Sequence, residues 1–173
     1  MPQKMLTDGN RNLAFVPTLA NYHAPKLSEL TGAGVLNLSC LITLADFQLG
    51  ATGNAEINDP GYCATLEVKA PGLPTYEGAS TFFRWKDTVD DKGWTTFTHA
   101  GIAGYLVERI GQIAEGEKAH EVPFKVGDEV RVFQVLTGTP RVLSPQTASY
   151  EKFGMTWYIQ EETDERAVVA AGA

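Results

Sequence analysis

The sequence predicts a β-rich α+β protein, a β-sandwich or partial barrel with one flanking α-helix. Segments with alternating apolar and polar residues recur along the chain, as half-buried strands require. Clusters of Gly, Pro, Asn and Asp separate these segments at short intervals, which is typical of antiparallel sandwiches and barrels. Only Trp94–Gly101 has the spacing of an amphipathic helix beside them.

Composition favours one domain over residues 1–173 and excludes several classes of protein. The net charge is −7 and Lys and Arg are scattered singly, so the basic patch of a nucleic-acid-binding protein is missing. No apolar run approaches the roughly 20 residues of a transmembrane helix. The N-terminus lacks the apolar core of a secretory signal, so synthesis in a cytoplasm is the default expectation.

The N-terminal third predicts two strands. Residues 1–12 are polar and predict an N-terminal arm, followed by a first strand over Leu13–Thr18 that Pro17 ends or confines to an edge. Ser28–Leu30 has room for one helical turn at most. Leu36–Thr43 alternates cleanly and predicts a second strand.

Residues 45–62 predict a long loop because Gly, Asn, Asp and Pro interrupt them throughout. Loops of this length are usually functional or disordered. A flexible surface excursion is one interpretation, and a loop that becomes ordered against a partner subunit is the other. Its candidate contact residues are Phe47, Leu49, Ile57, Asp59 and Tyr62.

The middle of the chain predicts two strands and the helix. Leu66–Ala70 reads as a strand ended by a turn at Pro71–Pro74, and Thr75–Lys86 reads as the strongest strand. The acidic pair before the helix favours its N-terminus. Trp94 and Phe97 are spaced i, i+3 and predict the face that packs on the sheet.

The C-terminal half predicts further strands joined by a polar connection over residues 113–125. Tyr105–Ile110 is a candidate for carrying Glu108 or Arg109 to a lumen or a subunit boundary. A C-terminal arm is expected at about residues 162–173. The remaining predicted strands are Asp128–Thr137, Arg141–Leu143, Tyr150–Glu161 and Arg166–Val169.

Apolar side chains on both faces of most strands indicate assembly. A monomeric sandwich keeps its outer faces polar. Here one face of the sheet is expected to pack on the subunit's own core, and part of the other on another chain. The residues concerned are Leu41, Phe82, Phe83, Val107, Phe133, Val135, Trp157 and Tyr158.

The residues that could carry chemistry are few. His23, His99 and His120 lie far apart, and none has a His or Cys partner at metal-ligand spacing. We therefore expect no enzyme, metal or cofactor. Cys40 and Cys63 are interpreted as two buried reduced thiols, with a single bridge between neighbouring strands as the alternative.

Several segments, in order along nearly the whole chain, resemble the major tail protein, or tail tube protein, of long-tailed phages (siphoviruses) infecting actinobacteria. None of them is a catalytic signature, and their order and spacing together carry the resemblance. The segments are TDGN (7–10), FVPTLAN (15–21), AP (24–25), EL (29–30), LSCLIT (38–43), INDPGYC (57–63), APG (70–72), YEGASTFFRW (76–85), WTTFTHAGIAGYLVERIG (94–111), VGDEVRVFQV (126–135) and DERAVVAAG (164–172).

The resemblance implies a structural protein of the virion that is assembled in the host cytoplasm. Such proteins form rings, usually hexameric, that stack into a hollow tube, and strands of every subunit join into an inner β-barrel. The long loop and the terminal arms reach the next ring. The partners implied are further copies of the chain, a tape measure protein and tail tip and terminator proteins, and genomic DNA passes through without specific binding.

The residues themselves fit this resemblance. A sheet closed across subunits leaves no exposed edge, and acidic walls repel the phosphates of passing DNA. Other virion components remain alternatives, namely a tail terminator, a head–tail connector or a decoration protein. A monomeric small-ligand-binding barrel is a more remote one.

Overall fold

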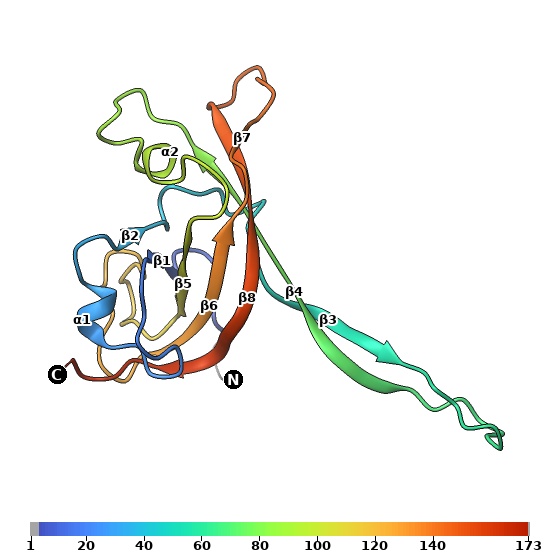
Figure 1. The fold of residues 1–173 in the computed structure, drawn as a ribbon. Helices are drawn as coiled ribbons and strands as arrows, with labels where there is room; N and C mark the ends of the chain where they lie inside the picture. The colour runs from blue at the N-terminus through green and yellow to red at the C-terminus, as the bar shows by residue number, and fades with distance from the viewer. Residues whose placement is uncertain (1–3, 173) are drawn as a thin grey trace.

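In the computed structural model, which describes residues 4–172, eight strands form one antiparallel sheet (Figure 1). Its order is β2-β1-β5-β6-β8-β4-β3, with β7 paired to β8 outside that path. The strands are β1 (Arg11–Val16), β2 (Leu36–Asn37), β3 (Gln48–Ile57), β4 (Ala70–Phe83), β5 (Ala103–Ile110), β6 (Glu129–Thr137), β7 (Arg141–Val142) and β8 (Lys152–Val168), and the helices are α1 (Leu27–Leu30) and α2 (Lys92–Thr96). The predicted β-rich fold with few helices is confirmed.

Strand β8 joins the strands β2, β1, β5 and β6 on one side of it to β4 and β3 on the other. Its first residues pair with β4, from Lys152 opposite Phe83 to Thr156 opposite Ala79. From Trp157 onward it pairs with β6 instead, through two register shifts. Such irregularities bend a strand, and Figure 1 shows β8 as a long curved ribbon. The residues predicted as a C-terminal arm therefore belong to the sheet as far as Val168.

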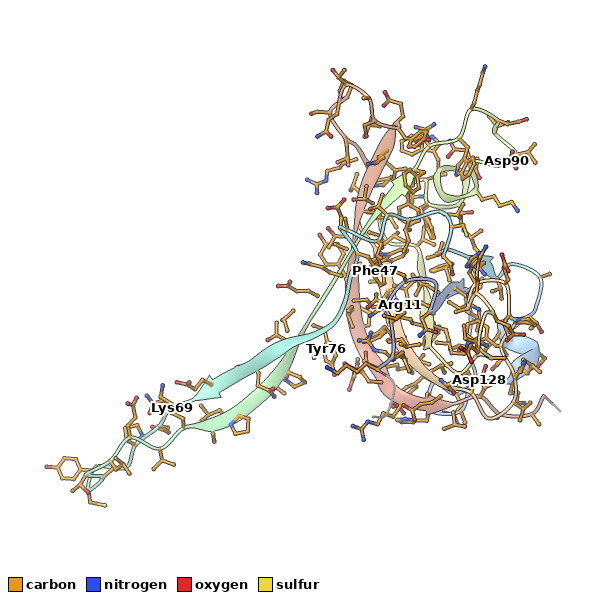
Figure 2. All side chains as sticks on the ribbon, turned by 180° about the vertical axis from the view of Figure 1, so that it is seen from behind. Arg11, Phe47, Lys69, Tyr76, Asp90 and Asp128 are labelled. Atoms are coloured by element: carbon orange, nitrogen blue, oxygen red, sulfur yellow. The ribbon has the colours of Figure 1, made fainter. Side chains whose placement is uncertain are left out.

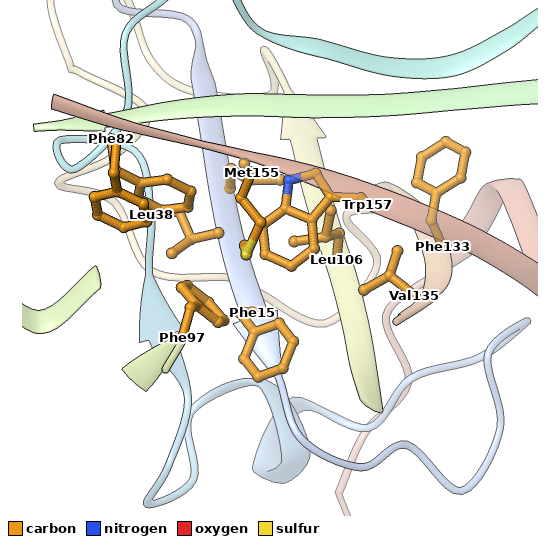
Figure 3. Packing of buried hydrophobic residues seen from close by; sticks show 11 residues of the cluster. Phe15, Leu38, Phe82, Phe97, Leu106, Phe133, Val135, Met155 and Trp157 are labelled. Carbon is orange, nitrogen blue, oxygen red and sulfur yellow. The ribbon is translucent and has the colours of Figure 1, made fainter. Parts of the chain in front are cut away.

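The first hydrophobic core lies on one face of the sheet and is mainly aromatic (Figure 3). The Phe97 ring, just after α2, lies edge-on to Phe15 at 5.2 Å and to Trp157 at 5.3 Å between centroids. Phe82 and Phe153 stack at 4.8 Å. The segment after β2 adds Leu38, which is fully buried. Helix α2 and that segment together cover this face.

The second core lies on the opposite face and is made of aliphatic side chains for the most part. Successive residues of β1 and β5 alternate between the two cores, as period-two geometry requires. Leu30 of α1, Leu19 and Phe124 cover this side. The expectation that Val107, Phe133, Val135 and Trp157 leave a face open for another chain is therefore wrong, because the subunit buries all four.

Several predicted elements differ from the structure. Residues 45–62 do not form a long loop, because Gln48–Ile57 is strand β3. The predicted turn at Pro71–Pro74 lies inside the single strand β4. Only Leu36 and Asn37 of the predicted second strand are in β2, and the segment after them turns away to cover the first core.

Candidate assembly interface

A long β-hairpin leaves the body of the molecule. Strands β3 and β4 pair from Gln48 opposite Ala79 to Ile57 opposite Ala70, with irregularities near Thr52 and Ala55. Only Ala79–Phe83 of β4 also pairs with β8. The rest of the hairpin is a two-stranded ribbon, which Figure 1 shows extending well away from the other strands.

The ribbon has almost no packing of its own. In Figure 2 its side chains point outward into open space, whereas those of the body are crowded together. The apolar side chains that it exposes are Ile57, Tyr62, Leu66, Val68 and Leu73. An isolated two-stranded hairpin is marginally stable in water, and exposed apolar side chains gathered in one place indicate a contact surface.

The five candidate contact residues of the predicted loop separate into two groups. Phe47 and Leu49 are half-buried and pack against the first core at the base of the hairpin. Ile57 ends β3, and Asp59 and Tyr62 follow it at the tip, all three exposed. The structure therefore places the first pair at the root of the hairpin and the other three on its exposed outer part.

The strand predicted over Leu66–Ala70 is not formed, because β4 begins only at Ala70 and the residues before it belong to the tip of the hairpin. Leu66, Val68 and Leu73 are exposed on the hairpin beside the predicted residues. The two prolines of β4, Pro71 and Pro74, were interpreted as a turn, although they lie inside the strand that continues to Phe83. The structure shows why these prolines are tolerated. Between Ala70 and Gly78, β4 pairs with β3 alone, so the prolines remove no hydrogen bond to a further strand.

A buried ionic cluster anchors the root. The Glu108 carboxylate, fully buried on β5, accepts hydrogen bonds from Arg11 Nη1 and Arg131 Nη1, each at 2.7 Å. Arg131 Nη2 donates to the backbone oxygen of Leu49 at 2.9 Å. The guanidinium lies so close to Gly50 that a Cβ there would be 2.5 Å from Nη2. Arg131 therefore ties the base of β3 to the body.

Neither Glu108 nor Arg109 reaches a lumen or boundary, contrary to expectation. Both are fully buried. Arg109 donates to Asp128 Oδ2 at 2.8 Å and to the backbone oxygens of Ala119, Val122 and Pro123. It thereby holds the polar connection between β5 and β6 against the second core.

Helix α2 is shorter than predicted and is positioned mainly by one ring. Phe97 follows the helix and is fully buried, whereas Trp94 is half-buried against Phe153 at 5.1 Å. The Arg84 guanidinium lies over the Trp94 ring at 4.1 Å and donates to Asp91 at 2.8 Å. Asp91 thus binds a side chain of the segment after β4 and does not cap the helix through its carboxylate.

The two cysteines are exposed and not bonded to each other. Both sequence interpretations, buried thiols and a bridge between neighbouring strands, are therefore wrong for the subunit. Cys63 lies at the tip of the hairpin, in the turn after β3. Cys40 lies in the body, in the segment that follows β2.

Two polar pairs link the C-terminal half of β8 to other segments. The Tyr105 hydroxyl donates to Glu162, and burial together with this bond raises the pKa of Tyr105 to about 12. The Asp164 carboxylate lies 2.5 Å from Nδ1 of His23. Partial burial alone would raise the pKa of Asp164, but the bonds to His23 and to the Arg166 backbone outweigh it and lower that pKa.

Among residues 4–172, no group of three or more His, Cys, Asp and Glu side chains is arranged to hold a metal ion. In the same range, no helix has the length and apolar character needed to cross a membrane.

Comparison with known families identifies the kind of protein to which the chain belongs. The family model described as phage tail tube protein matches residues 1–172. The chain belongs to the phage tail tube protein family. It is therefore a structural subunit of the phage tail tube, and its place is the tail of the virion, as the resemblance of the sequence implied. A search of the curated proteins found no match.

Membership in this family implies that the chain assembles with further copies of itself, because a tail tube is built from many copies of its protein. It also decides between the tail tube subunit and the alternatives left open by the sequence, namely other virion components and a ligand-binding barrel.

Proposed function

We propose that copies of this tail tube subunit form rings, hexameric as the resemblance implies, and that the β3–β4 hairpin of each copy crosses to the next ring. The observation that carries the proposal is the hairpin itself. It exposes a row of apolar side chains on a ribbon with support only at its root. Such a ribbon is stabilised when it lies against a neighbouring copy.

The placement of the hairpin favours an open assembly. Its tip lies at one end of β4 and the body lies at the other, so a tip that meets the body of a second copy contacts a surface unlike itself. Contacts between unlike surfaces are heterologous, and they propagate into filaments when they do not close. Stacking of rings into a tube is this kind of growth.

The same proposal covers the contents and ends of the tube. A subunit with net charge −7 gives the assembly an acidic character that repels DNA phosphates, which suits a conduit through which the genome passes without specific binding. A tape measure protein inside the tube, and terminator and tail tip proteins at its ends, are the further partners that we propose.

Electron microscopy of the purified protein at high concentration tests stacking. We expect filaments of constant diameter from the wild-type chain. The matched variant replaces residues 52–75 by Asn-Gly, which joins the register partners Ala51 and Tyr76 through a two-residue turn. Both strands are shortened together, so the root and the core remain intact.

The shortened variant should be monomeric or form isolated rings while its thermal unfolding stays close to that of the wild-type subunit. Filaments of normal length from the shortened variant would show that the hairpin does not join rings. If the wild-type protein formed only closed rings at every concentration, the stacking proposal itself would be wrong.

A further inference from the structure

An apolar pocket of about 470 Å³ lies at the end of β4 opposite the hairpin tip. Its lining residues are Cys40, Phe83, Arg84, Trp85, Lys86 and Tyr150. The Tyr150 ring meets Phe83 edge-on at 6.0 Å between centroids. Tyr150 is 79% exposed and Trp85 45% exposed, so two large aromatic side chains at the pocket are open to solvent in large part.

The hairpin tip has side chains that match this pocket. Tyr62 is completely exposed and Leu66 is 75% exposed, so the tip offers an aromatic and an aliphatic side chain within one turn. Cys63 lies beside Tyr62 and is also exposed. Aromatic side chains paired edge-on or offset contribute beyond their buried area, which favours Tyr62 against Trp85 and Tyr150.

The tip is acidic and, within the described part of the chain, the pocket has one cation that is free to pair with it, among groups of both signs. The tip carries the exposed carboxylates of Asp59 and Glu67, and the one cation nearby, Lys69, is paired with Glu56. At the pocket, Arg84 is engaged by Asp91, whereas Lys86 has no ion pair within residues 4–172. The other charged groups near the pocket by sequence are Asp87, Glu151 and Lys152.

The geometry of β4 decides which copy the tip meets. The strand is 14 residues long, so the tip side and the pocket side are separated by roughly 45 Å of extended chain. A hairpin therefore cannot fold back onto its own pocket. A head-to-tail arrangement of two copies brings the tip of one to the pocket of the other and leaves a free tip and a free pocket for the next copies.

We propose that the hairpin tip, residues 58–69, docks into this pocket on a copy in the adjacent ring. This inference rests on the proposed stacking and names the surface that receives the hairpin. Tyr62 and Leu66 fill the apolar pocket, and Glu67 or Asp59 approaches Lys86. The arrangement also brings Cys63 of one copy next to Cys40 of the following copy.

The two thiols provide the test. Tubes of the wild-type protein, identified first by electron microscopy, are treated with diamide and separated by non-reducing gel electrophoresis. Each cross-link forms one S–S bond, and the two thiols give two electrons and two protons to the N=N bond of diamide, which becomes a hydrazine. Because each subunit carries one thiol of each kind, head-to-tail links should produce a ladder of dimers, trimers and longer chains.

Single-cysteine variants separate the possible partners. Cys40→Ser and Cys63→Ser should each form tubes and give no cross-links. A mixture of these two variants, assembled together, should give dimers and nothing longer. If Cys40→Ser alone still gave dimers through Cys63, the tips would pair with each other, and the pocket would not be their site. Wild-type protein kept dilute and unassembled is the matched control and should remain monomeric.

A charge exchange tests the same contact without thiols. Lys86→Glu places a like charge opposite the tip and should raise the protein concentration needed for tubes by roughly tenfold. Adding Glu67→Lys on the same chain should restore most of the loss. Tubes that form with no ladder and no effect of Lys86→Glu would overturn the docking site while leaving stacking intact. An absence of tubes from the wild-type chain would instead contradict the proposed function.

Discussion

At the scale of single residues, Phe97 matters more to α2 than Trp94. The Phe97 ring is fully buried and contacts Phe15, Phe82 and Trp157, whereas Trp94 is half-buried and lies between Phe153 and Arg84. The i, i+3 spacing correctly identified both side chains as the packing face. It did not rank them, because the helix ends at Thr96 and the chain turns Phe97 into the core.

Phe97→Ala should therefore lower the free energy of unfolding by about 3–5 kcal/mol, the range found for buried aromatic truncations. Trp94→Ala removes one aromatic pair and one cation–π contact, and should cost about 1–2 kcal/mol. Urea denaturation of both variants measures the difference. An equal or larger loss in Trp94→Ala would mean that α2 is held mainly by its first turn.

The raised pKa of Tyr105 predicts that the free energy of unfolding falls at alkaline pH. Its pKa is raised to about 12 in the folded chain from an ordinary value of 10, because burial and the bond to Glu162 favour the neutral phenol. A raised folded pKa contributes stability below pH 10 that is lost as the pH rises from 10 to 12.

Wild-type protein should thus lose stability over this interval relative to Tyr105→Phe, which has no phenol to ionise. Tyr158→Phe changes an exposed tyrosine and should behave as the wild type does. Unfolding curves at several pH values between 9 and 12 provide the comparison, and parallel curves for wild type and Tyr105→Phe would refute the assignment.

At the scale of elements, the hairpin depends on its root. Arg131 is the side chain that joins β3 to the body, through Glu108 and the Leu49 backbone. Arg131→Met keeps the apolar stem and removes both bonds, so we expect a loss of about 1–3 kcal/mol in unfolding free energy. Amide exchange at Leu49 and Gly50 should also accelerate. Arg141→Met, on exposed β7, is the matched control and should change neither quantity.

Strand β3 of the same hairpin was not predicted from the sequence. Gly50, Gly53 and Asn54 were read as loop signals, yet they lie in β3, where Gly50 gives room to the Arg131 guanidinium and the other two lie near irregularities in the ladder. Alternation found β1, β5, β6 and most of β8, because those strands bury side chains. A ribbon with both faces exposed carries no such pattern, so its existence depends on long-range pairing that one sequence does not reveal.

The exposed residues of the hairpin tip, which we propose as contact residues, were predictable to a similar degree. Ile57, Asp59 and Tyr62 were identified from their apolar or charged character within a long polar segment. The pocket lined by Cys40, Trp85 and Tyr150 brings together segments that lie far apart in the chain. No spacing rule brings such segments together.

At the scale of the whole molecule, one hydrophobic core lies on each face of the sheet, and Tyr158 on β8 stays exposed. In the assembly that we propose, this tail tube subunit uses what projects from the body and what lies at its ends. The hairpin supplies the first and the pocket beyond β4 supplies the second. Because the hairpin tip and the pocket lie at opposite ends of β4, contacts between them can repeat from one copy to the next along an axis.

Hydrogen exchange of the hairpin amides, measured in the free subunit and in assembled tubes, tests this account most directly. The ribbon from Gly53 to Thr75 has little packing of its own, so its amides should exchange quickly in the free subunit. In tubes they should be protected by at least tenfold, while the amides of β5 and β6 change little. Equal exchange of the ribbon in both states would contradict the claim that the hairpin joins one ring to the next.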